Sequence, residues 1–134
     1  MAWHNFGALV AGVGAVLHVG FAYKETLGWN REFVDKVAHS WIEGLSVDDS
    51  NERILWAKPL AFNMGAYNLV LAGGLAWTCW AFIRQPALAG KLGTFFAIWL
   101  VAAAAAAFYT QVYPAGVLQG GFGLLLLLAA WLPS

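Results

Sequence analysis

Two side chains near the start of the sequence, His18 and Glu25, are of the types that move protons. They are seven residues apart, so on a helix they would share one face, about 10 Å apart along the axis. An imidazole accepts or donates a proton near neutral pH, and a carboxylate can orient it. At that separation the two groups meet only through a water molecule or a substrate. The spacing indicates a candidate pair for acid–base chemistry.

A second group of polar side chains consists of amides and phenols set in apolar sequence. Asn63 and Tyr67 are four residues apart and would share a helix face, whereas Asn68 would point away from Asn63. A phenol can donate a proton or hydrogen-bond an oxyanion, and amides can orient a polar head group. We therefore predict three catalytic residues, His18, Glu25 and Tyr67, and five substrate-binding residues, Trp29, Asn63, Asn68, Tyr109 and Gln119.

Four long apolar stretches must position these side chains. The chain of 134 residues is 61% apolar and 10% charged, with a mean hydropathy of +0.66. Stretches of about 18–25 residues are long enough to cross about 30 Å of hydrocarbon as helices, and the alternation typical of a membrane β-barrel is absent. The sequence predicts an all-α integral membrane four-helix bundle as a single domain over 1–134, with spans at about 5–23, 59–83, 88–109 and 114–131.

The polar residues fall near one membrane face. In an antiparallel bundle the first and third spans end on the side where the second and fourth begin; we call this side B, and the opposite face side A. His18, Asn63 and Gln119 all lie four or five residues inside the side-B ends of their spans. Polar groups in hydrocarbon cost free energy. Their matched depth predicts an intramembrane polar pocket, with these side chains and Tyr67 pointing into the bundle.

The connection between the first two spans, 24–58, carries most of the charge. It contains five of the seven Lys and Arg residues, and this excess predicts that the connection is cytoplasmic. Within it, apolar residues recur at helical spacing over 31–44, with charged residues between them. We predict an amphipathic interfacial helix there, lying on side B or folding over the bundle.

The residues leave three classes of function open. One is a membrane-embedded enzyme that performs proton transfer or isomerisation on a lipophilic substrate. Another is a non-enzymatic accessory or lipid- or pigment-binding subunit of a larger membrane complex, since amides and phenols commonly hydrogen-bond between membrane helices. A third is a small proton-coupled transporter, for which four spans imply a homo-oligomer. The sequence has no basic patch for nucleic acid.

The sequence lacks a recognisable set of ligands for a metal ion or a haem. A zinc site would need His39 to join His18 and Glu25, and a haem on His18 would have no recognisable second ligand. We therefore predict no metal site, and the cofactor is left unassigned.

Four short motifs, in order along the chain, suggest a family. They are His18 with Glu25 and Trp29; Asn63, Gly65, Tyr67 and Asn68; Tyr109; and Gln119-Gly120-Gly121. In these motifs the chain resembles a bacterial family of small four-helix integral membrane proteins of unknown function, sometimes labelled epimerase-like. The resemblance implies a multi-pass protein of the bacterial inner membrane and an isomerase-like activity. Leu17, Met64 and Phe122 stand where that family often has Glu, Gln and Pro.

Overall fold

The computed structural model describes residues 2–29, 58–110 and 112–131. These residues form four helices and no strand: α1 (Ala2–Thr26), α4 (Lys58–Arg84), α5 (Pro86–Tyr109) and α6 (Tyr113–Trp131). Each helix is long and apolar enough to cross a membrane. The predicted all-α four-helix membrane fold is confirmed, and the chain is a multi-pass membrane protein. The predicted helix at 31–44 lies outside the described residues.

The helices extend slightly beyond the predicted spans. α5 begins at Pro86, two residues before the predicted start, because proline is tolerated in a first turn, whose N–H groups have no partner within the helix. Gln85 alone separates α4 from α5, and its N–H donates to the Ala81 carbonyl at 2.7 Å. At the other end of the bundle, α1 continues to Thr26, whose hydroxyl donates to the Ala22 carbonyl at 2.6 Å.

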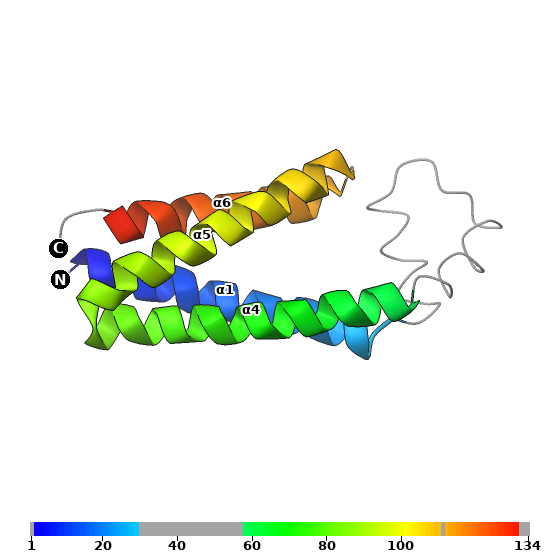
Figure 1. Cartoon of the computed structure of the whole chain (residues 1–134), viewed down its shortest axis with the longest axis horizontal. Coiled ribbons are helices and arrows are strands. Elements are labelled where there is room, and N and C mark those ends of the chain that lie inside the picture. Colours follow the sequence, from blue (N-terminus) through cyan, green and yellow to red (C-terminus); the bar gives the residue numbers. More distant parts are fainter. Residues whose placement is uncertain (1, 30–57, 111, 132–134) are drawn as a thin grey trace.

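The bundle consists of two antiparallel helix pairs, α1 with α4 and α5 with α6 (Figure 1). The residues that α1 and α4 turn toward each other are mostly small. They are spaced alternately three and four apart, and this spacing keeps one stripe of each helix facing its partner. We call this contact the α1–α4 seam. On α1 it comprises Ala8, Ala11, Ala15, His18, Ala22 and Glu25, and on α4 it comprises Ala61, Gly65, Asn68, Ala72, Leu75 and Cys79.

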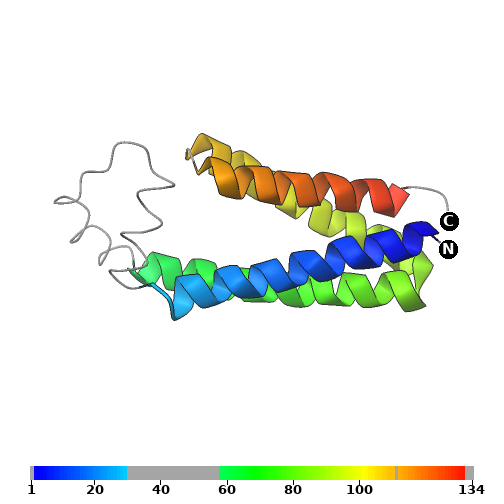
Figure 2. The same cartoon turned by 180° about the vertical axis from the view of Figure 1, so that it is seen from behind.

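The two pairs contact each other mainly in their side-A halves. The Phe82 ring lies against Gly7 of α1, where an added methyl group would come within 2.5 Å of it, and also against Gly93 of α5. The Phe96 ring of α5 lies directly on Gly74 of α4. From this contact the pairs diverge toward side B, as Figures 1 and 2 both show. The bundle is therefore closed at one end and splayed at the other.

Candidate functional site

A hydrogen bond between Asn68 and Glu25 joins α4 to α1 near side B. The Asn68 amide nitrogen donates to the Glu25 carboxyl oxygen Oε2 at 2.6 Å, in a partly buried position. Gly65, one turn away on α4, allows this approach, because a methyl group there would lie 3.0 Å from the Ala22 carbonyl oxygen and 3.2 Å from the Glu25 Cβ. The small residues of the seam thus bring a carboxylate and an amide together, with Glu25 at the side-B end of the apolar helix α1.

His18 is sealed in the same seam. Its side chain is only 2% exposed, and its ring nitrogen Nδ1 lies 2.8 Å from the Gly14 carbonyl oxygen. A carbonyl only accepts hydrogen bonds, so Nδ1 carries the hydrogen and, in the neutral ring, Nε2 is left as an acceptor. Nε2 is buried and has no hydrogen-bond partner among the described residues. The Phe21 ring meets the imidazole edge-on, with centroids 5.6 Å apart.

His18 and Glu25 therefore share one helix face, as the sequence predicted, and that face is turned toward α4. Their seven-residue separation keeps them about 10 Å apart along the axis, so they do not touch directly. The prediction that Asn68 faces a different neighbour from Asn63 is also confirmed, because Asn68 bonds to α1. Its part in holding Glu25 was missed, although its place in the stripe of small residues on α4 was a usable signal.

The structure does not gather the predicted polar side chains into one contiguous region with His18. Asn63 is exposed and Tyr67 is 73% exposed, so neither packs with His18. Tyr67 lies two turns before Gly74, and Asn63 three turns before it, so both share the face of α4 on which Phe96 of α5 packs. They are uncovered because the helix pairs have diverged at their level (Figure 2). Matched depth in the sequence did not reveal this divergence.

Of the three remaining predicted residues, Gln119 and Trp29 are partly buried and Tyr109 is exposed. Gln119 is partly buried and lies three residues before Phe122, on the face of α6 that approaches Gly14 of α1. Tyr109 is 89% exposed at the end of α5, so it does not pack with the buried His18. Trp29 is partly buried just beyond the end of α1.

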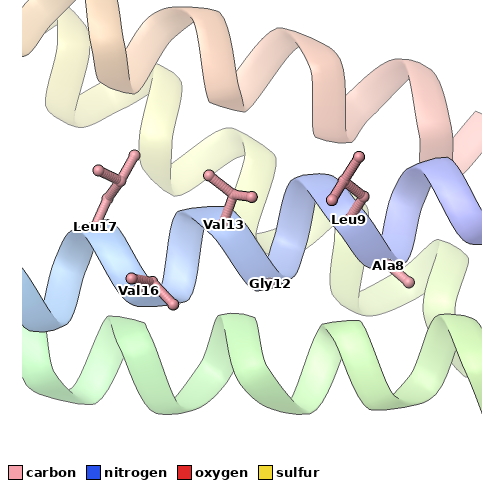
Figure 3. Close-up of a pocket in the computed structure, with 6 residues that line it drawn as sticks. All are labelled: Ala8, Leu9, Gly12, Val13, Val16 and Leu17. Atoms are coloured by element: carbon pink, nitrogen blue, oxygen red, sulfur yellow. The ribbon is translucent and has the colours of Figure 1, made fainter.

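A hollow on the surface of α1 has no polar lining side chain. It has a volume of about 380 Å³ and is lined by Ala8, Leu9, Gly12, Val13, Val16 and Leu17. Figure 3 shows Leu9, Val13 and Leu17 rising from α1 toward the side on which α6 runs. This hollow can accommodate an apolar chain, but it offers no group for acid–base chemistry.

Within the described ranges, no three His, Cys, Asp or Glu side chains come close enough to hold a metal ion. His39, which a zinc site would need, lies outside these ranges. Glu25, Tyr67 and the amide side chains can form hydrogen bonds, and the carboxyl and phenol groups can also transfer protons.

Comparison with known proteins places the chain in a family. No curated protein matches it, and no solved structure does. A family model described as "Protein of unknown function (DUF1304)" matches residues 12–131, which include most of α1 and all of α4, α5 and α6. The resemblance to a family of unknown function is thereby confirmed, and the chain belongs to the DUF1304 family.

Proposed function

We propose that the protein binds a lipophilic molecule with a polar end group between its two helix pairs at side B, and isomerises it by proton transfer. The observation that carries this proposal is the exposure of Tyr67 and Asn63 on the face of α4 that turns toward α5. Polar side chains on an inward face inside a membrane are costly unless they meet a polar partner. A bound polar end group would supply that partner.

The side chains around the proposed site suit a molecule that has both a polar end group and an apolar body. Gln119 lies on the inward face of α6 and could contact the same end group as Tyr67 from the opposite pair. Phenol and amide groups both donate and accept hydrogen bonds, which suits a hydroxyl or carbonyl. Phe21 and Phe122 on the neighbouring inward faces offer aromatic surface for an apolar body.

Glu25 is the group best placed to transfer a proton. It lies eleven residues, about three turns, after Gly14, so it shares the face of α1 that approaches Phe122 of α6. The hydrogen bond from Asn68 orients its carboxyl group. An isomerisation would remove a proton from one carbon of the bound molecule and return one to another carbon, with Glu25 as acceptor and Glu25 or Tyr67 as donor. His18, sealed in the seam, does not contact the molecule in this conformation.

Photolabelling tests the binding site directly. The protein in lipid nanodiscs is irradiated with a long-chain fatty alcohol carrying a diazirine, and the labelled residues are mapped by mass spectrometry. We expect labels to concentrate on the inward faces of α4 and α6 near Tyr67 and Gln119, and to fall in Tyr67→Phe. Tyr109→Phe is the matched control, because this phenol lies on the exposed end of α5. Equal labelling around all four helices would refute the proposal.

The accessory-subunit alternative rests on a different observation, the apolar hollow on α1. A helix of a partner protein could cover Leu9, Val13 and Val16, which are all exposed. Val13→Trp would fill the hollow and should shift the native protein to a smaller complex in gels of solubilised membranes. An unchanged complex size would count against this alternative, and it would leave the binding proposal unaffected.

A further inference from the structure

The proposed ligand site is closed toward side A by side chains that pack between the two helix pairs. The Phe96 ring of α5 lies directly on Gly74 of α4. Gly14 of α1 is covered as well, because an added methyl group there would lie 3.4 Å from Leu75 of α4 and 3.9 Å from Phe122 of α6. Leu75 is only 1% exposed. All four helices therefore contribute to one packed layer, made by these five residues, which we call the floor.

On the side-B side of the floor, α4 and α5 no longer cover each other. Tyr67 lies two turns from Gly74 on the same face of α4, and it is 73% exposed. The stretch of α5 that follows Phe96 toward side B includes six consecutive alanines, 102–107, so whichever face this run turns toward α4 carries nothing larger than methyl groups. Bulky side chains thus close the interface at the floor, and small ones leave it open beyond.

The depth of the open part follows from the helix geometry. Gly74 is seven residues further along α4 than Tyr67, which places the floor about 10 Å from the level of the phenol. One half of the hydrocarbon core of a bilayer is about 15 Å thick. An acyl chain of the surrounding lipid fills that half, so it is longer than the space between Tyr67 and the floor.

We propose that Phe96 determines specificity in the ligand site by limiting the apolar body enclosed between the helix pairs to about 10 Å below the polar end group. This inference rests on the proposed function. The ligand is then an amphiphile whose enclosed apolar part is shorter than a lipid acyl chain, and any longer chain leaves the bundle sideways into the bilayer. The Phe95 ring meets the Phe96 ring edge-on, with centroids 5.1 Å apart, and helps to hold it over Gly74.

The residues just beyond the floor can report whether a ligand passes it. Thr78 follows Gly74 by one turn of α4 toward side A and is fully buried. Gly93 precedes Phe96 by about one turn of α5, and the Phe82 ring packs against it. Without the Phe96 side chain, an apolar chain could extend past Gly74 to Thr78 and Gly93, as far as Phe82.

Two long-chain fatty alcohols, one with a diazirine next to the hydroxyl end and one with it at the far end of the chain, measure the depth in lipid nanodiscs. Labelled residues are mapped by mass spectrometry. We expect the first probe to label residues near Tyr67 in wild type and in Phe96→Ala alike. The second probe should leave Thr78 and Gly93 unlabelled in wild type and label them in Phe96→Ala. Phe62→Ala is the matched control, because it removes the same ring from an exposed site on α4 and should give the wild-type pattern.

The two probes separate failure of this inference from failure of the proposed function. Labelling of Thr78 or Gly93 by the far-end probe in wild type would overturn the floor, and this measurement stands even if Phe96→Ala does not fold. A folded Phe96→Ala with the wild-type pattern would overturn the role of Phe96. Absence of labels near Tyr67 with the first probe would instead refute the binding site itself, and the floor proposal would fall with it.

Discussion

The close approach of α1 and α4 at Gly65 predicts that Gly65→Ala destabilises the protein relative to Gly73→Ala, a substitution on the same helix. In Gly65→Ala the new methyl group would meet the Thr26 methyl group and lie 3.0 Å from the Ala22 carbonyl oxygen. That oxygen belongs to the backbone, so α1 and α4 must separate. In Gly73→Ala, eight residues further along the same helix, the new methyl group meets nothing within 4 Å. The two substitutions are chemically identical, and only their surroundings differ.

The magnitude follows from the difference between the two variants. Replacing glycine by alanine inside a helix favours the helix by about 1 kcal/mol at either position, so this gain cancels. Overpacking at a tight contact costs about 1–3 kcal/mol, and it applies at Gly65 alone. We therefore expect Gly65→Ala to be about 1–3 kcal/mol less stable than Gly73→Ala, which is roughly a fivefold to 150-fold change in the unfolding equilibrium.

The difference in unfolding free energy is measured by reversible unfolding of both variants in bicelles. The signals are helicity and a spectroscopic probe of the distance between α1 and α4. The reasoning also requires that Gly65→Ala weaken the Asn68–Glu25 hydrogen bond, which vibrational spectroscopy of the labelled carboxylate detects. If Gly65→Ala proves as stable as Gly73→Ala, the helices are not in contact at Gly65. The close approach that holds Glu25 would then be refuted.

Three further predictions concern other parts of the molecule. His18→Leu keeps the seam filled, so the bundle should stay folded, with its unfolding free energy within about 1.5 kcal/mol of wild type; a bundle that fails to fold would make His18 a structural residue. Trp131→Phe removes a hydrogen bond of 3.1 Å from Trp131 Nε1 to Thr94 Oγ1 and should cost about 0.5–1.5 kcal/mol, whereas Trp99→Phe, at an exposed site on α5, should cost less in the same unfolding assay. In a Cys79→Ala background, Ser50→Cys should escape an impermeant maleimide added to intact cells, as expected for a cytoplasmic 24–58 connection; labelling would establish the reverse orientation.

Much of this architecture was predictable from local sequence. Long apolar stretches bounded by prolines and polar residues predict four membrane helices, because unpaired backbone groups cannot remain in hydrocarbon. The seven-residue spacing of His18 and Glu25 predicts one shared face, because helical periodicity depends on position alone. The separate directions of Asn63 and Asn68 follow from the same rule.

Tertiary structure decided which of these faces are covered. His18, Asn63 and Gln119 have matched depths in the sequence, yet depth says nothing about whether two helix pairs stay in contact along their whole length. That depends on Phe82 and Phe96 packing against glycines near side A, which are contacts between residues distant in sequence. The Asn68–Glu25 bond likewise depends on the register of α1 against α4. A polar residue in a membrane helix is visible in the sequence, whereas its partner is chosen by helix packing.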